Sequence, residues 1–264
     1  MLLLAQLPAH GDAVLQIEQL SKEIDTRPNS ALFLKRGELH RMRGEFDAAL
    51  ADYDQAAHAD RAMGTADLYR GKALLEAGRP EEARMALDRF LEKAPSHAEG
   101  FLVRARTFSA LKQYQQAADD YRRSIELTLS PPAEHIIEHS QALVMAGKSA
   151  EALKELDAAI VRLGENPFLQ SAAIEIDTKE QRYEAALIRL DRLIQVEGRN
   201  EFLLYRRAEI LRLSGHEIEA QRTFQEILAA IEKTPAPLRD KATVDLEQLA
   251  KIQTRRPLRG LESP

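Results

Sequence analysis

The chain has 264 residues, of which 44% are hydrophobic and 30% charged, with 37 Lys and Arg against 42 Asp and Glu and a net charge of −5. This balance argues against a general nucleic-acid-binding protein, which needs a large basic surface. The absence of cysteine excludes disulfides, thiolate metal sites and a cysteine nucleophile. No stretch of the sequence is apolar over the length that an integral membrane segment needs.

The first eleven residues contain an apolar run, Met1 to Leu7, which Pro8, Ala9 and Gly11 follow. This run resembles the end of a secretory signal whose basic first part is missing. On that interpretation the protein is bacterial and is exported to the periplasm, and an upstream start codon would complete the signal. The alternative is a short disordered N-terminus on a cytoplasmic protein. We favour export and leave the compartment open.

A regular period begins after a single predicted helix in residues 12–29. A small residue recurs at spacings of 34, 34, 35, 34 and 34, with a large residue four positions later and a turn residue five positions earlier. The small residues are Ala49, Ala83, Ala117, Ala152, Ala186 and Ala220. The turn residues are Gly44, Gly78, Lys112, Gly147, Gln181 and Gly215. A period of this length is typical of stacked helical hairpins.

Close packing of two antiparallel helices explains the period. One helix ends near the turn residue and a second helix follows, with its alanine pressed against the first helix. The first helix has its own small residue, at Gly37, Gly71, Ala105, Ser140, Ala173 and Ala208. The last two spacings in that set, 33 and 35, predict one extra residue in the fifth turn, around Lys179 to Arg182. This register keeps Asp177 out of the core.

The pattern resembles the tetratricopeptide repeat family, whose unit is a helix–turn–helix of about 34 residues. The resemblance is carried by residues 46–49 with Tyr53, by residues 113–121 and by residues 182–187. It implies an all-α fold, a right-handed superhelical solenoid of antiparallel helix–turn–helix repeats. Six repeats are expected, at about 30–63, 64–97, 98–132, 133–165, 166–200 and 201–233.

Both ends of the stack need a cover, because the last hairpin of a solenoid otherwise exposes an apolar face. Residues 12–29 are expected to form a half-repeat that caps one end. Residues 236–252 are amphipathic and are expected to form the capping helix at the other end. The tail, residues 253–264, carries three arginines and two prolines and is predicted to be disordered.

One string suggests catalysis: His135 to His139 matches the HxxEH pattern of a zinc hydrolase. Two histidines four residues apart share a helix face and could bind zinc. However, His139 is expected to face the repeat core, and no motif supplies a third ligand. No phosphate-binding glycine loop or GxSxG turn is present. We therefore expect a protein that is not an enzyme and has no metal or other cofactor, with the zinc hydrolase as the alternative.

The resemblance implies that the first helices line a concave groove that binds a peptide or a helix of a partner protein, whose identity is unknown. The candidate groove residues are Glu38, Arg41, Lys72, Glu76, Arg106, Ser109, Gln141, Asp177, Glu209 and Arg212. Some family members grip the C-terminal carboxylate of a chaperone with a cationic clamp. The corresponding positions in the first three repeats are Leu34, Glu38, Tyr69, Glu99 and Val103. They do not form such a clamp, and neither does the next set of positions, so this mode of binding is not expected.

Overall fold

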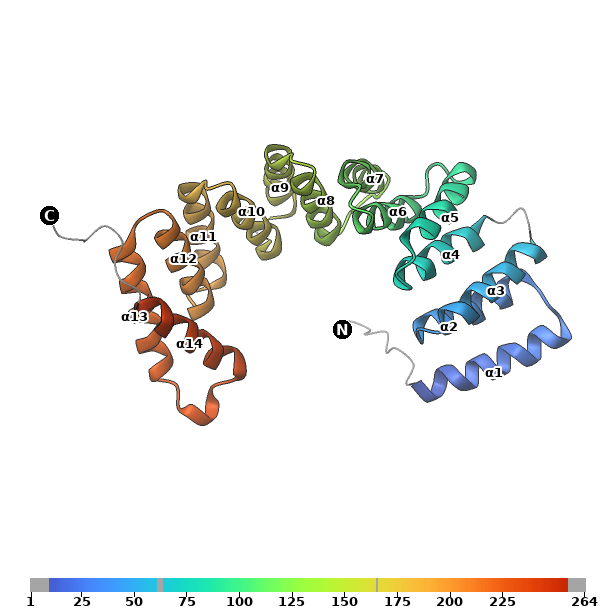
Figure 1. The fold of residues 1–264 in the computed structure, drawn as a ribbon, viewed down its shortest axis with the longest axis horizontal. Coiled ribbons are helices and arrows are strands. Elements are labelled where there is room, and N and C mark those ends of the chain that lie inside the picture. The colour runs from blue at the N-terminus through green and yellow to red at the C-terminus, as the bar shows by residue number, and fades with distance from the viewer. Residues whose placement is uncertain (1–9, 61–63, 165, 256–264) are drawn as a thin grey trace. The chain divides into compact units, whose positions relative to one another are not determined.

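The computed structural model describes residues 10–60, 64–164 and 166–255. Within these residues the chain forms fourteen α-helices, one short 3-10 helix and no strand, an all-α helical solenoid (Figure 1). The chain divides into two compact units, Met1–Ala146 and Gly147–Pro264. We call them unit 1 and unit 2 and describe each by itself.

Unit 1 begins with a single helix and continues with three helical hairpins and one further helix. Its helices are α1 (His10–Thr26), α2 (Ser30–Met42), α3 (Phe46–Ala59), α4 (Thr65–Glu76), α5 (Pro80–Lys93), α6 (Ala98–Ala110), α7 (Tyr114–Glu126) and α8 (Ala133–Met145). Helices α2 and α3, α4 and α5, and α6 and α7 pack against each other in pairs.

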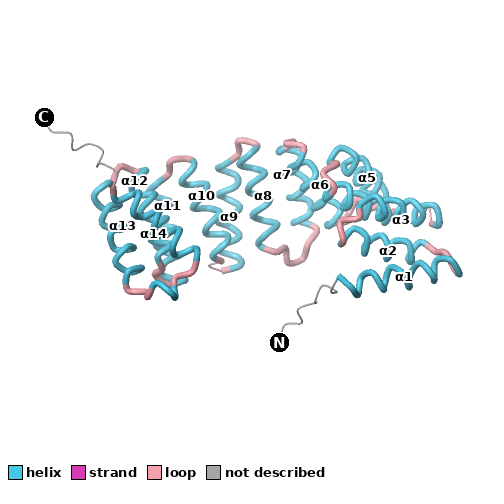
Figure 2. The backbone as a smooth tube through the Cα atoms, turned by 60° about the horizontal axis from the view of Figure 1, so that its bottom comes forward, coloured by secondary structure: helices cyan, strands magenta, loops and turns pink. Residues whose placement is uncertain are grey.

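Unit 2 has the same construction, with two complete hairpins between single helices. Its helices are α9 (Ser149–Leu163), α10 (Pro167–Lys179), α11 (Tyr183–Glu197), α12 (Glu201–Leu213), α13 (Glu217–Glu232), the 3-10 helix η1 (Ala236–Leu238) and α14 (Lys241–Thr254). Helices α10 and α11, and α12 and α13, pack in pairs. Figure 2 shows the short loops that join consecutive helices. The division of residues 30–233 into six repeats stays a prediction from the sequence.

The helices begin and end where their local sequence directs. Asn29 and Asn200 each precede a first helix, and each side chain accepts a hydrogen bond from the backbone N–H three residues later, at 3.0 Å. This contact satisfies a donor that has no partner inside the helix. The six turn residues all have positive φ, and four of them are glycine. The other two are Lys112 (φ 59°) and Gln181 (φ 58°). They adopt the same left-handed conformation, which is unfavourable for a residue that has a side chain.

The small residues of the period lie at the closest contacts between helices. The six recurring alanines of the second helices are 0–1% exposed. A Cβ atom placed on Gly37 would lie 2.5 Å from Cε1 of Tyr53, and one on Gly71 would lie 2.6 Å from Cγ of Leu87. Helices α2 and α4 therefore have room for only a small residue where the large residue of the second helix packs against them.

The prediction of a longer turn in the fifth repeat is wrong. The turn between α10 and α11 has three residues, Glu180 to Arg182, like the turn between α2 and α3. The regular spacing therefore holds, and Ile174, not only Ala173, is fully buried at the contact between the helices. The same register places Asp177 in the core, with 0% of the residue exposed. The prediction that Asp177 faces the groove is therefore also wrong.

Ion pairs make the buried carboxylate of Asp177 tolerable. Arg189 on α11 donates from Nε to Oδ2 of Asp177 at 2.8 Å, and Nε of Arg182 lies 3.2 Å from Oδ1. Arg189 also donates to Asp157 on α9 at 2.6 Å. A buried charge is stable only when it is paired, and this network supplies the pairing. The sequence prediction was based on the spacing of apolar residues, which does not indicate that a buried carboxylate can be paired with arginines of a neighbouring segment.

The C-terminal end of unit 2 is covered by α14. Leu246 and Ala250 on this helix pack into a cluster with Phe224, Ile227 and Ile231 of α13. No helix in the described residues is long and apolar enough to cross a membrane. The suggested signal remnant lies outside the described residues except for His10 and Gly11, which belong to α1. Of the predicted disordered tail, Gln253 and Thr254 are instead part of α14, and residues 256–264 lie outside the described residues.

Candidate functional site

The first helices of the hairpins form a surface in each unit, which we call the first-helix face. It consists of α2, α4, α6 and α8 in unit 1, and of α10 and α12 in unit 2. In unit 1, α4 contacts both α2 and α6 directly. In unit 2, Nη2 of Arg206 on α12 donates to the carbonyl oxygen of Ser171 on α10 at 3.1 Å. Neighbouring first helices therefore lie side by side in both units.

The cations on the first-helix face of unit 1 are paired with acids. Arg41 donates to Glu38 on its own helix at 2.9 Å and also to Glu76 on α4. Lys72 on α4 lies 2.5 Å from Glu99 on α6. These pairs join successive first helices, so the positive charges of this face are neutralised by its own carboxylates.

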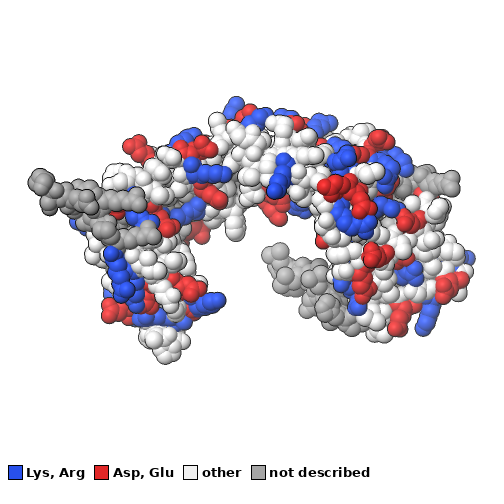
Figure 3. All heavy atoms as spheres, viewed as in Figure 1, with Lys and Arg blue, Asp and Glu red and all other residues white. Residues whose placement is uncertain are grey.

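The third cation of this face is paired in the same way. Arg106 on α6 donates two hydrogen bonds to Glu138 on α8, at 2.8 and 2.9 Å. These hydrogen bonds raise the pKa of Arg106, and those to Glu38 raise the pKa of Arg41. Figure 3 shows one face of the molecule, on which acidic and basic side chains of unit 1 lie next to one another.

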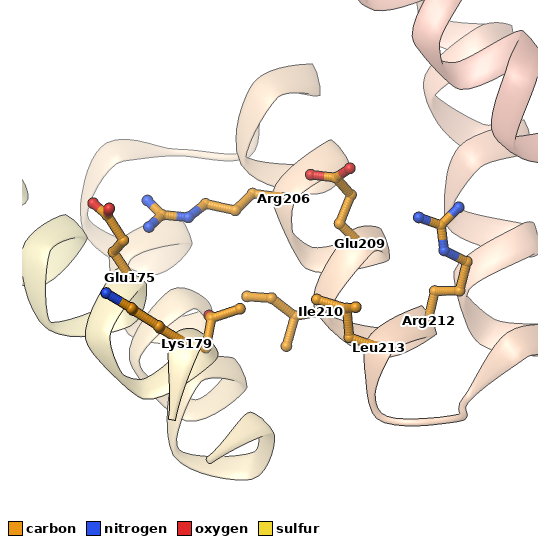
Figure 4. A pocket seen from close by; sticks show the side chains of 8 residues that line it. Glu175, Lys179, Arg206, Glu209, Ile210, Arg212 and Leu213 are labelled. Atoms are coloured by element: carbon orange, nitrogen blue, oxygen red, sulfur yellow. The ribbon is translucent and has the colours of Figure 1, made fainter. Parts of the chain in front are cut away.

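Unit 2 has a different first-helix face, with an open pocket of about 490 Å³ between α10 and α12. Its lining combines charged side chains with the apolar side chains of α12 (Figure 4). The lining residues are Glu175, Thr178, Lys179, Arg206, Glu209, Ile210, Arg212 and Leu213.

The cations of this pocket have no ion pair within the described residues. The one hydrogen bond that Arg206 makes there goes to the Ser171 carbonyl, and its guanidinium extends toward Glu175 (Figure 4). Burial lowers the pKa of Arg206, the opposite of the change at Arg41 and Arg106. Nη1 of Arg212 is buried and has no hydrogen-bond partner in the described part of the chain. The pocket thus contains cations that its own carboxylates do not pair with in the described residues.

Two exposed phenylalanines flank the contact between α10 and α12. Phe168 is 72% exposed and Phe202 is 51% exposed. They are 34 residues apart and occupy the same position in consecutive first helices. Phe168 lies one helical turn before Ser171, and Phe202 lies one turn before Arg206, so both flank the hydrogen bond that joins the two helices. Large exposed aromatic side chains at one place are typical of a binding surface.

The sequence analysis did not single out these phenylalanines, although a signal for them was present. The same register position holds Ala31, Thr65, Glu99 and Glu134 in the earlier repeats. Phenylalanine at that position in two consecutive repeats is a change of composition that packing does not require, because both side chains are exposed.

The repeated helical hairpins can be compared with those of known proteins. The family model described as tetratricopeptide repeat matches residues 34–96 and 68–134. The chain therefore contains tetratricopeptide repeats, which the family model finds in residues 34–134. The family model covers the hairpins of unit 1, and the fold of the remaining residues is supported by solved structures. No curated protein matches the chain in sequence.

Three solved structures of tetratricopeptide repeat proteins show how far the fold is shared. One from Parabacteroides merdae is 19% identical and covers 91% of this chain and 93% of its own, with a TM-score of 0.59. The C-terminal part of a repeat protein from Cytophaga hutchinsonii is 14% identical and covers 89% and 94%, with a TM-score of 0.69. YrrB, described as having an unusual peptide-binding site, is 21% identical and covers 71% and 97%, with a TM-score of 0.58.

The candidate groove residues of the chain lie in three kinds of place. Most of those in unit 1 belong to the ion pairs described above, while Ser109 is half-buried and Gln141 is exposed. Glu209 and Arg212 line the pocket of unit 2. Asp177 lies in the core. A role for any of them in binding stays a prediction.

The HxxEH string has other contacts in the repeat. His139 is buried on α8, with its ring centroid 6.5 Å from that of Tyr121. The carboxylate of Glu138 receives both hydrogen bonds from Arg106. In the described residues, no group of three His, Cys, Asp or Glu side chains is arranged to hold a metal ion. Nothing in the described geometry therefore supports a zinc-dependent reaction at His135 and His139.

Proposed function

We propose that the chain is a non-catalytic protein-binding scaffold that holds a segment of a partner protein on the first-helix face of unit 2. The tetratricopeptide repeat fold supports a protein-interaction scaffold in general. The observation that carries the specific proposal is the open pocket between α10 and α12, where Arg206 and Arg212 have no ion pair in the described residues. Exposed Phe168 and Phe202 lie in the first turns of the same two helices.

The pairing of charges favours unit 2 over unit 1 as the binding surface. A partner that bound Arg41 or Arg106 would have to displace Glu76 or Glu138, which already occupy the guanidinium groups. Such an exchange of one ion pair for another gains little free energy. In unit 2 a partner would add contacts to cations that have no ion pair in the described residues, and it would cover two exposed aromatic rings.

YrrB supports the proposal at the level of the fold. Its description names a peptide-binding site, and its helices superpose on this chain with a TM-score of 0.58. Helical hairpins stacked in this way present a continuous surface to which an extended segment can bind.

The proposal is tested by selecting peptides from a random display library on the intact chain and measuring their affinity by fluorescence anisotropy. Replacing both Phe168 and Phe202 by serine should weaken the selected peptides at least about tenfold, because apolar burial is lost at both rings. The matched control is Ile188→Ser on α11, an exposed apolar residue of a second helix, which should leave the affinity unchanged.

A second control tests unit 1. Charge reversal of Arg41, Lys72 and Arg106 should leave peptide affinity within about twofold, provided that circular dichroism shows the variant is folded. Peptides that lose affinity with this variant, and not with the phenylalanine variant, would place the binding surface in unit 1 and overturn the proposal.

A further inference from the structure

The first-helix face of unit 2 has an apolar group at each end of α12. Phe202 lies in its first turn, and Leu213, which is 54% exposed, is its last residue. Eleven residues of α-helix separate them, which corresponds to roughly 16 Å along the helix axis. Phe168 on α10 extends the apolar group at the Phe202 end, one repeat away.

The cations lie between these apolar ends. Arg206 is one turn after Phe202, and Arg212 is next to Leu213. Lys179, from the end of α10, lines the same pocket. Because Glu175 and Glu209 also line it, the pocket has three positive and two negative side chains, a formal excess of one positive charge. This balance matches one carboxylate and disfavours a run of acids, since a second carboxylate would meet Glu175 or Glu209.

The length of the site determines how far apart the apolar side chains of a bound ligand must be. An extended chain advances about 3.3 Å per residue, so a span of roughly 16 Å corresponds to about five residues. A ligand in extended conformation would therefore place one apolar side chain near Phe202 and another near Leu213, with the acid between them.

We infer that unit 2 recognises an internal, extended segment of a protein that carries one acidic side chain between two apolar side chains about five residues apart. The inference rests on the proposed function and adds the chemistry of the partner. The acid is a side chain and not a chain end, because a segment that stopped at the cations would leave one of the two apolar groups uncovered. Covering both groups requires the chain to continue on each side of the carboxylate.

The test uses short synthetic peptides with blocked ends and the intact chain. The parent peptide has leucine at positions 1 and 6 of a six-residue core and one glutamate at position 4. Its relatives replace glutamate by glutamine or either leucine by serine. A fifth peptide ends in a free carboxylate at the position of the glutamate. Fluorescence anisotropy measures the dissociation constant of each peptide.

We expect the parent peptide to bind about tenfold more tightly than the glutamine peptide, the change that loss of a charge-assisted hydrogen bond produces. Each leucine-to-serine peptide should also bind more weakly, and the peptide with the terminal carboxylate should bind more weakly than the parent. When the same peptides are measured with the variant Arg206→Gln or Arg212→Gln, the preference for the glutamate peptide over the glutamine peptide should fall to about twofold or less. The control Arg41→Gln in unit 1 should keep the full preference.

Three results would overturn the inference. The first is equal binding of the glutamate and glutamine peptides. The second is tighter binding of the terminal carboxylate, which would assign the cations to a chain end. The third is no measurable binding of the parent peptide while library peptides of other composition bind. If these library peptides still depend on Phe168 and Phe202, the proposed function stands and only the chemistry of the partner is wrong. If they do not, both are wrong.

Discussion

Unit 1 and unit 2 share one backbone plan and use their charges in opposite ways. On the first-helix face of unit 1, Arg41, Lys72 and Arg106 are each paired with a carboxylate of the neighbouring first helix. In unit 2 the carboxylate of Asp177, which pairs with Arg189 and Arg182, is buried in the core, while Arg206 and Arg212 on the face have no ion pair in the described residues. The hairpin contacts determine the backbone, and the pairing of surface charges distinguishes a closed face from one that can accept a ligand.

The largest effect on stability should come from Asp177. Leu74 in unit 1 occupies the same register position and is buried among apolar side chains. Replacing Asp177 by alanine should lower the free energy of unfolding by about 3 kcal/mol, because Arg189 loses a buried partner and a cavity remains. Urea unfolding followed by far-UV circular dichroism measures the loss.

The variant Asp177→Leu is the matched control for this prediction. Leucine fills the space as Leu74 does, and Arg189 keeps its hydrogen bond to Asp157, so the loss should be clearly smaller than that of Asp177→Ala. Equal losses for the two variants would mean that the ion network, and not the filled volume, stabilises this position. The core of unit 2 would then differ from that of unit 1 in more than one side chain.

The part of the fold that depends on size could be predicted from the sequence. The recurring alanines and the turn residues follow from steric limits that a single chain displays six times, and the structure buries all six alanines. The register of the fifth repeat could not be predicted, because apolar spacing contains no information about Arg189, which is twelve residues away and compensates Asp177. For the same reason the sequence did not predict that Arg41 forms ion pairs and that Arg206 forms none in the described residues.

The turns offer a smaller effect that should be equal in both units. Lys112 in unit 1 and Gln181 in unit 2 have positive φ where the other four turns have glycine. Replacing either by glycine should raise the free energy of unfolding by about 1 kcal/mol, because glycine adopts this conformation without steric cost. Urea unfolding of the two variants checks the gain. A gain in one unit alone would show that the turns differ, and the contrast between the units would then not be confined to their charges.

The smallest effect addresses the contrast in charge directly. Arg41→Gln removes the partner of Glu38 and Glu76, so it should lower the free energy of unfolding by about 0.2–1 kcal/mol, the range measured for ion pairs that water reaches. The loss should shrink at high ionic strength, because salt screens the pair that the variant lacks. Arg206→Gln should cost nothing measurable or should stabilise slightly, because burial outweighs the attraction of Glu175 at this guanidinium, which forms no ion pair in the described residues.

Urea unfolding of the two variants at low and at high salt provides the measurement, and Lys35→Gln on α2, an exposed residue, is the control for a change of charge alone. A partly buried Arg206 that adds nothing to the free energy of unfolding would fit a role in ligand binding, because binding sites often keep residues that do not stabilise the fold. If Arg206→Gln instead lost as much stability as Arg41→Gln, with the same dependence on salt, Arg206 would belong to a structural ion pair. The two faces would then be alike, and the case for ligand binding in unit 2 would rest on its phenylalanines alone.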